Sequence, residues 1–133
     1  MTRTGSCLCG AIRYETDQEM GPVTGCHCTQ CRKWTGHHVA ALPVPWDALR
    51  LTGALTWYAA SPGARRGFCG TCGSSLIWEE GDGLAYLMAG TLDAPTGLAM
   101  DGHVFCADAG DYYRLGDGLP RWVAGRSGPE MEA

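Results

Sequence analysis

Short segments of alternating polarity, separated by glycine-rich turns, make up most of the chain. Residues 11–16 alternate apolar and polar side chains, which is the period-two pattern of a half-buried strand. We predict further strands at residues 23–26, 39–44, 54–60, 65–69, 74–78, 85–91 and 103–106. Pro43 and Pro45 predict that the far end of the 39–44 strand lies at a sheet edge. The pattern therefore predicts a mainly β protein.

One segment has the character of a helix. Residues 29–35 precede Gly36, and glycine commonly ends helices. A helix here would place Cys28 and Cys31 on one face, because three residues are close to one turn. Residues 46–51 fit either one helical turn or an irregular crossing. We therefore expect at most short helices.

Composition supports one turn-rich domain. The chain has 133 residues, which suits a single domain, and its 20 glycines favour turns and short strands over long helices. We expect one zinc-binding domain over residues 1–125 and a disordered tail over 126–133, where the side chains are small and polar.

Charge and hydropathy exclude several classes of partner. The formal net charge of −4 argues against nonspecific binding to nucleic acid or to an acidic membrane surface. No stretch approaches the roughly 20 apolar residues of a membrane span, and the first residues lack the apolar run of a signal peptide. We expect a cytoplasmic protein, whose reduced thiols act as metal ligands rather than forming disulfides. The oligomeric state is left open.

Seven of the eight cysteines form three clusters with the spacing of metal ligands. Four thiolates satisfy a tetrahedral Zn²⁺, and three leave one position open. We predict two zinc ions per chain. The structural zinc is expected on Cys7, Cys9, Cys69 and Cys72, and the second zinc on Cys26, Cys28 and Cys31. Buried free cysteines are the alternative interpretation.

The fourth ligand of the second zinc stays open. His27, His37 and His38 are near in sequence, but His27 lies between two ligands and would point away from the metal on a strand. We favour a hydrogen-bonding role for it. The alternative is a second structural zinc completed by a histidine or by Cys106. An iron–sulfur cluster is disfavoured, since it usually needs four cysteines. Cys106 and His103 receive no role.

In order and spacing, these residues resemble the glutathione-dependent formaldehyde-activating enzyme family, which also includes centromere protein V. The segments that carry the resemblance are residues 5–14, 26–36, 68–76, 103–105 and 117–120. The resemblance implies a β-tent fold, with antiparallel sheets around the structural zinc. It also implies that Cys26, Cys28 and Cys31 hold a catalytic zinc. The implied reaction joins glutathione to formaldehyde as S-hydroxymethylglutathione, or reverses that step.

We therefore predict a zinc-dependent carbon–sulfur lyase that acts on a small-molecule thiol adduct, with glutathione as the candidate thiol. Arg32 and Lys33 could attract the carboxylates of a peptide-like thiol, and Trp34 and His37 are further candidate substrate contacts. A non-catalytic zinc module for protein–protein interaction is the alternative. Thiol redox chemistry at the Cys69 pair ranks last, because zinc ligation would silence it.

Overall fold

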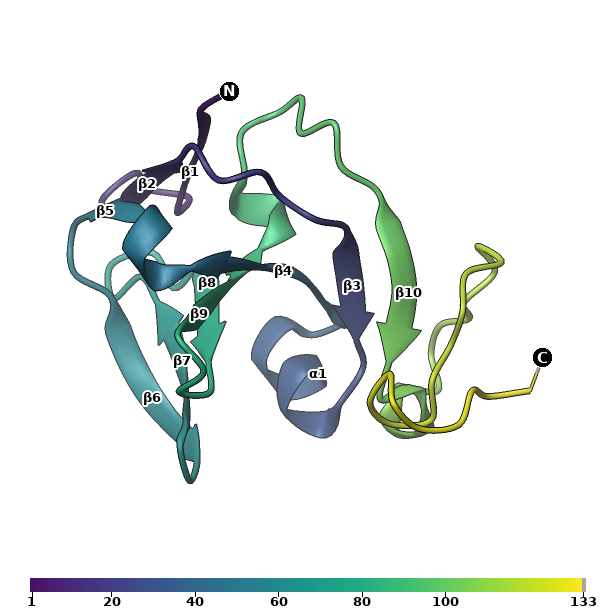
Figure 1. The fold of residues 1–133 in the computed structure, drawn as a ribbon. Helices are drawn as coiled ribbons and strands as arrows, with labels where there is room; N and C mark the ends of the chain where they lie inside the picture. Colours follow the sequence, from purple (N-terminus) through teal and green to yellow (C-terminus); the bar gives the residue numbers. More distant parts are fainter. Residues whose placement is uncertain (133) are drawn as a thin grey trace. The chain divides into compact units, whose positions relative to one another are not determined.

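The structure is a computed structural model that describes residues 1–132, and the chain divides into two compact units (Figure 1). Unit 1 comprises residues 1–21 and 42–98, and unit 2 comprises residues 22–41 and the segment from residue 99 onward. Strands dominate the described residues, with two sheets and one α-helix, so the mainly β prediction is confirmed.

Unit 1 contains a three-stranded antiparallel sheet and most of a larger sheet. The small sheet has the order β1-β2-β5, formed by β1 (Arg3–Ser6), β2 (Arg13–Thr16) and β5 (Arg50–Thr52). The larger sheet continues from β4 in the order β9-β8-β7-β6. Its strands are β4 (Val39–Pro45), β6 (Thr56–Ser61), β7 (Ala64–Phe68), β8 (Ser75–Glu79) and β9 (Leu84–Met88).

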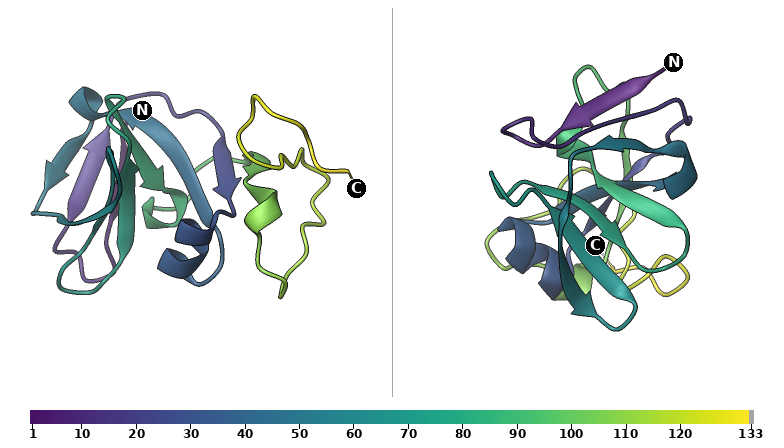
Figure 2. Two further views of the ribbon diagram at one scale, coloured as in Figure 1. Left: turned by 90° about the horizontal axis from the view of Figure 1, so that it is seen from below. Right: turned by 90° about the vertical axis from the view of Figure 1, so that its left-hand side faces the viewer.

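Figure 2 shows these strands from two further sides, and the apolar core of unit 1 lies among them. Leu76 and Ile77 are neighbours on β8, and both are only 1% exposed. Successive strand residues point to opposite faces, so both faces of β8 are covered at this point. Leu42 and Val44 of β4 are also fully buried. Two single turns of 3₁₀ helix follow strands here, at Trp46–Ala48 and Ala89–Thr91. The segment that fitted two interpretations is thus a helical turn leading into β5.

Unit 2 contains the short strands that carry the second cysteine cluster. β3 (Val23–Cys26) pairs in parallel with β10 (Met100–Val104) and antiparallel with the start of β4. The helix α1 (Thr29–Thr35) lies between β3 and β4 in the chain and has the bounds that the sequence predicted. A 3₁₀ turn, η3 (Cys106–Asp108), follows β10.

β4 lies between β3 and β9 in the order of the larger sheet. Its register with β3 covers residues 39–41 and ends ahead of Pro43 and Pro45, so neither proline interrupts that ladder. The edge position expected for its far end stays a prediction. One detail differs from the sequence-based expectation. The expected 103–106 strand ends at Val104, because Phe105 adopts a left-handed conformation with φ of 55°. Among the described residues, none of the helices has the length and apolar character needed to span a membrane.

Candidate metal centres

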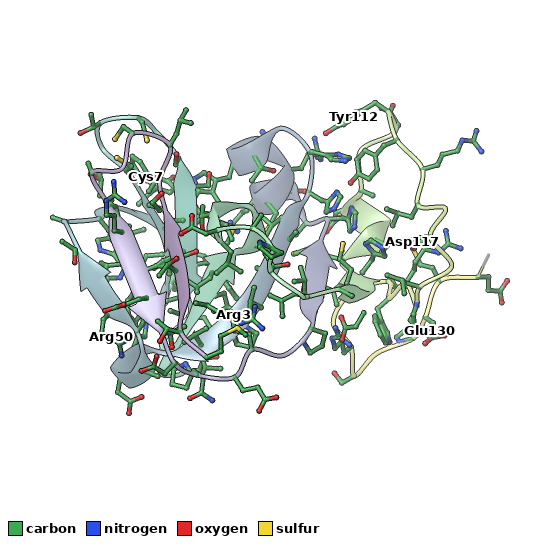
Figure 3. The ribbon with its side chains drawn as sticks, turned by 90° about the horizontal axis from the view of Figure 1, so that it is seen from above. Arg3, Cys7, Arg50, Tyr112, Asp117 and Glu130 are labelled. Carbon is green, nitrogen blue, oxygen red and sulfur yellow. The ribbon has the colours of Figure 1, made fainter. Side chains whose placement is uncertain are left out.

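Two turns carry the four cysteines of unit 1. Cys7 and Cys9 lie between β1 and β2, and Cys69 and Cys72 lie between β7 and β8. Figure 3 shows sulfur atoms gathered beside Cys7. The four sulfur atoms all lie within 4.8 Å of one another, although the two pairs are about sixty residues apart in sequence. The fold of unit 1 therefore brings the two pairs together.

The two turns share a local conformation. In one, the N–H of Cys7 donates to the carbonyl of Ile12 at 3.0 Å, and in the other the N–H of Cys69 donates to the carbonyl of Ser74 at 3.0 Å. Both bonds span five residues. The glycine that follows the second cysteine has φ of 80° in one turn and 79° in the other, a region that glycine adopts without strain. The two turns are thus closed in a similar way, although their cysteines are spaced differently.

The sulfur spacing fits a tetrahedral metal ion. The sulfur atoms of Cys7 and Cys9 are 3.6 Å apart, and those of Cys9 and Cys69 are 3.8 Å apart. Zinc–sulfur bonds of about 2.3 Å in a tetrahedron place sulfur atoms roughly 3.8 Å apart. A disulfide would need about 2.05 Å. The arrangement therefore suits four ligands around one ion.

Three of these sulfur atoms lie within hydrogen-bonding distance of N–H or hydroxyl groups. The N–H of Ile12 donates to the sulfur of Cys7 at 3.3 Å, and the N–H of Cys72 donates to the sulfur of Cys69 at 3.4 Å. The hydroxyl of Ser74 lies 3.2 Å from the sulfur of Cys72. This hydroxyl, assisted by backbone N–H groups, lowers the pKa of Cys72 to about 5. A thiolate is the form that binds metal.

The three cysteines of unit 2 surround the junction of β3 and α1. Cys26 ends β3, Cys28 caps the N-terminus of α1, and Cys31 is buried in the first turn of that helix. The sulfur of Cys28 accepts the N–H of Cys31 at 3.3 Å. At the other end of the helix, Gly36 donates its N–H to the carbonyl of Arg32 at 2.8 Å. The strand end and the helical turn together hold three sulfur atoms within 4.8 Å.

This cluster needs a cation to hold three thiolates. Sulfur contacts with Cys28 and Cys31, followed by burial, raise the pKa of Cys26 far above its usual range. The cause is that a further negative charge beside existing ones is unfavourable, most of all away from water. A divalent ion would offset that repulsion. The chemistry of the donor set therefore fits a thiophilic metal such as zinc.

No histidine joins the three cysteines within residues 1–132. His27 is fully buried, and both of its ring nitrogens are engaged elsewhere: Nδ1 lies 2.6 Å from the hydroxyl of Tyr113, and Nε2 lies 2.9 Å from Nδ1 of His103. The expectation that His27 forms hydrogen bonds is confirmed. Cys106 is also outside the cluster, and its sulfur contacts the carbonyl of His103 at 3.5 Å.

All four histidines of the chain are neighbours in unit 2. The ring of His38 stacks on that of His27 with centroids 4.4 Å apart, and the ring of His37 meets Tyr113 edge-on at 4.3 Å. Burial and the neighbouring histidines lower the pKa of His27 to about 4, and burial also lowers the pKa of His38. The rings of His27 and His38 are therefore neutral at physiological pH.

The candidate substrate contacts lie on or just after α1. Lys33 and His37 are exposed, whereas Arg32 and Trp34 are half-buried. The Nε atom of Arg32 is buried and has no hydrogen-bond partner among the described residues. A buried donor of this kind is unusual, because leaving it unsatisfied is unfavourable. Of the four candidates, Arg32 thus has the clearest capacity to bind a further group.

Sequence reasoning gave no role to Tyr113 or Asp117. The carboxylate of Asp117 lies 2.7 Å from Nε2 of His103, which completes a chain of contacts to His27. Figure 3 places Asp117 and Tyr112 on the segment that follows β10. The only available signal was that residues 117–120 belong to the segments on which the family resemblance rests.

Comparison with known proteins places these centres in context. A lyase of Schizosaccharomyces pombe that is uncharacterized is 28% identical over 112 residues, which span 82% of this chain and 82% of that protein. A Halomonas elongata protein, provisionally named a glutathione-dependent formaldehyde-activating enzyme, is 37% identical over 87 residues, or 57% of this chain and 55% of that protein. The crystal structure of a Rhodobacter sphaeroides protein matches with a TM-score of 0.60 at 26% identity, covering 68% of this chain and 88% of that chain.

The family itself is shown by a match over most of the chain. Residues 2–108 match the model of the family described as glutathione-dependent formaldehyde-activating enzyme. That range contains all seven clustered cysteines, from Cys7 to Cys72. The chain belongs to the glutathione-dependent formaldehyde-activating enzyme family.

Proposed function

We propose that the protein is a zinc-dependent carbon–sulfur lyase that makes and breaks thiol–aldehyde adducts, with glutathione and formaldehyde as the leading pair. The observation that carries this proposal is the three-cysteine group at β3 and α1, which no fourth protein ligand joins within the described residues. A three-ligand zinc site keeps a position for substrate, whereas a four-cysteine site is closed. In this proposal Cys7, Cys9, Cys69 and Cys72 hold a structural zinc.

The proposed reaction needs a thiolate, a polarised carbonyl and a transferred proton. The thiol sulfur forms a bond to the carbonyl carbon, the carbon–oxygen π bond breaks, and the proton of the thiol ends on that oxygen. The reverse step returns the proton to sulfur. Zinc, when bound at Cys26, Cys28 and Cys31, would supply a Lewis-acidic position that favours the thiolate at neutral pH.

The residues of α1 and its C-terminal end would bind the rest of the substrate. The buried Nε of Arg32 is a donor with no partner in the described structure, so a carboxylate oxygen of glutathione would satisfy it. Exposed Lys33 offers a second positive charge. Trp34 and His37 follow these cations in sequence and are proposed as the remaining contacts.

The test is the rate of adduct exchange, measured by NMR with ¹³C-formaldehyde and glutathione above the uncatalysed background. We expect acceleration by protein that carries two zinc ions. Cys28→Ser should abolish it while one zinc and the fold are retained. Cys106→Ser is the matched control, since Cys106 is a buried cysteine outside both groups. Two bound zinc ions with no acceleration for any thiol–aldehyde pair would favour the non-catalytic zinc module instead.

A further inference from the structure

A continuous chain of polar contacts runs through unit 2 to the residue between two proposed metal ligands. Asp117 contacts His103 at 2.7 Å, His103 contacts His27 at 2.9 Å, and His27 contacts Tyr113 at 2.6 Å. His27 and His103 are 0% and 2% exposed, whereas the side chain of Asp117 is 41% exposed. Both ring nitrogens of each histidine are therefore used within this chain.

The chemistry of the end groups decides which group donates and which accepts in each of these contacts. An ionised carboxylate can only accept, so Nε2–H of His103 donates to Asp117. A neutral imidazole has one donor and one acceptor, so Nδ1 of His103 accepts from Nε2–H of His27. Nδ1 of His27 is then the acceptor for the hydroxyl of Tyr113. With both rings neutral, each buried ring uses one donor and one acceptor within these contacts.

We propose that Asp117, His103 and Tyr113 are positioning residues that fix His27, and with it the backbone that presents Cys26 and Cys28 to the second metal ion. His27 is covalently joined to both cysteines, so restraining its ring from two sides restrains the peptide units on either side of it. This inference rests on the proposed function in one respect, namely that the three cysteines bind metal.

The pairing of β3 with β10 provides separate support for this positioning role. β10 places His103 opposite Gly25 and Val104 opposite Cys26, and the N–H of His27 donates to the carbonyl of Val104 at 3.0 Å. A Cβ on Gly25 would lie 2.7 Å from Nδ1 of His103, the atom that meets His27. The sequence thus has its smallest residue where the His103 ring crosses the neighbouring strand.

The first test measures zinc affinity at the three-cysteine site of the full, zinc-loaded chain by competition with a chromophoric chelator. Loss of such outer hydrogen-bond partners typically weakens metal binding about 10–100-fold. We expect a loss of that size in Asp117→Asn and in Tyr113→Phe, with partial recovery in Asp117→Glu. Asp111→Asn and Tyr112→Phe are matched controls at adjacent exposed positions and should stay within about twofold of the unchanged protein.

Gly25→Ala perturbs the chain without removing a polar group. The added methyl displaces the His103 ring, so zinc affinity at the three-cysteine site should fall as it does in Asp117→Asn. Far-UV circular dichroism and zinc retained at the four-cysteine site report whether each variant is folded. In the cobalt-substituted protein, the sulfur-to-cobalt charge-transfer band of the second site should shift in Gly25→Ala and not in Tyr112→Phe.

A spectroscopic readout tests the direction of the chain independently of affinity. Long-range ¹H–¹⁵N spectra of the zinc-loaded protein should show His27 and His103 as neutral Nε2–H tautomers. An Nδ1–H tautomer on either ring, or a cationic ring, overturns the assignment. Zinc affinities within twofold across Asp117→Asn, Tyr113→Phe and Gly25→Ala overturn the positioning role.

These outcomes are distinguishable from failure of the proposed reaction. Weakened zinc binding in the variants, together with no adduct exchange in the unchanged protein, supports the positioning role and removes the proposed reaction. Adduct exchange in the unchanged protein with unaltered zinc affinity in the variants does the opposite. One zinc per unchanged chain, bound at the four-cysteine site, overturns both, because the second site then holds no metal.

Discussion

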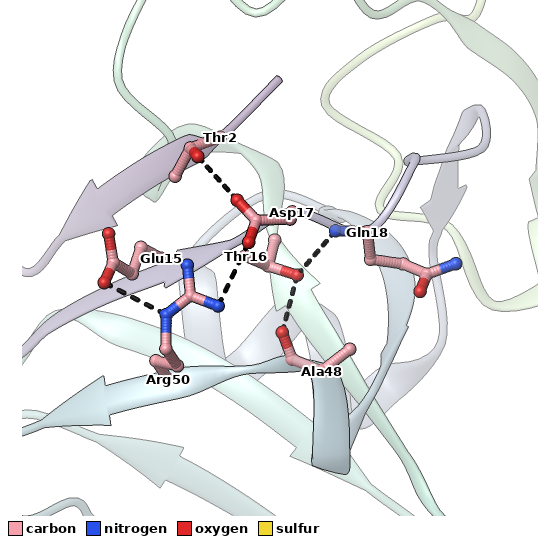
Figure 4. A network of polar contacts seen from close by, with 7 residues as sticks. All are labelled: Thr2, Glu15, Thr16, Asp17, Gln18, Ala48 and Arg50. Atoms are coloured by element: carbon pink, nitrogen blue, oxygen red, sulfur yellow. Dashed lines mark hydrogen bonds and ion pairs between the residues drawn. The ribbon is translucent and has the colours of Figure 1, made fainter.

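At the scale of single residues, a buried hydroxyl in unit 1 contributes more to stability than the exposed group of charges beside it. Figure 4 shows both. Thr16 is 1% exposed, donates to the carbonyl of Ala48 at 2.7 Å and accepts the N–H of Gln18 at 3.0 Å. Arg50 contacts Glu15 at 3.0 Å and Asp17 at 3.3 Å, but about half of its side chain is exposed. Solvent screening makes such exposed pairs weak.

Thr16→Val should therefore destabilise the protein more than Arg50→Ala. Valine has nearly the same shape as threonine but leaves one partly buried carbonyl and one N–H without their partner, which costs about 1–3 kcal/mol. Arg50→Ala should cost less, because solvent screens the exposed ion pairs of Arg50. Urea unfolding of the zinc-loaded protein at pH 7 measures both. A larger loss for Arg50→Ala would contradict the argument that burial decides the ranking.

The Arg50 effect should also disappear in acid. The hydroxyl of Thr2, and then Arg50, lower the pKa of Asp17 below its ordinary value of 3.8. A carboxylate whose folded pKa is depressed stabilises the fold above its unfolded pKa, and this contribution is lost as the pH falls through the folded value. The difference between Arg50→Ala and the unchanged protein should shrink between pH 5 and pH 3. A difference that grows in acid would contradict the sign.

At the scale of elements, the sequence predicted those helices and strands whose formation depends on neighbouring residues. The helix at 29–35 was predictable because the cysteine spacing and Gly36 are local features, and the structure gives it the same bounds. β1 was not predicted, since its sequence has no alternation and its pairing with β2 depends on residues 7 to 13 positions away. The register of β4 with β3, which ends before its prolines, was also not predictable from local residues, because it is set by the neighbouring strand.

Two glycines with left-handed backbone conformations allow the cost of local strain to be distinguished from the cost of a long-range contact. Gly53, after β5, has φ of 92°, and a Cβ there would lie 2.3 Å from the carbonyl oxygen of Ala11. Gly63, in the turn between β6 and β7, has φ of 78° and no heavy atom within 4 Å of such a Cβ. Pro62 and Gly63 suit the second and third positions of a type II turn.

Alanine at Gly63 should cost only the left-handed strain, about 1–2 kcal/mol. Alanine at Gly53 should cost at least about 1 kcal/mol more, because the backbone carbonyl it meets cannot move as freely as a side chain. Urea midpoints of the two variants give the comparison. Equal losses would mean that the turn between β1 and β2, which contains Ala11, yields easily.

At the scale of the whole molecule, the candidate metal centres were predictable from the sequence, whereas the residues that support them were not. Cysteine pairs separated by one or two residues are recognisable as candidate metal ligands from their spacing. Unit 1 brings the sulfur atoms of its two distant pairs within 4.8 Å of one another. Tyr113 and Asp117 have no such spacing. Tyr113 lies 86 residues from His27, so its role depends on where the segment after β10 returns. Supporting contacts of this kind are properties of the fold rather than of a motif.

Stepwise removal of zinc should separate the two centres. We expect a chelator to take the three-cysteine zinc first, with little change in circular dichroism, because that site has one ligand fewer. Loss of the four-cysteine zinc should coincide with unfolding of unit 1, since structural zinc binds with about 10–16 kcal/mol in small peptides. That is as large as the stability of a typical domain, about 5–15 kcal/mol.

Variants assign the two phases of zinc release. Cys28→Ser should lack the first phase and keep the second, whereas Cys69→Ser should fail to fold at any zinc concentration used for the unchanged protein. Zinc release followed with a chromophore and unfolding followed by circular dichroism are recorded on one sample. If both ions left together while the secondary structure persisted, the strands of unit 1 would be stable without the bridge between their two cysteine turns. The role of the four-cysteine centre would then lie in function rather than in folding.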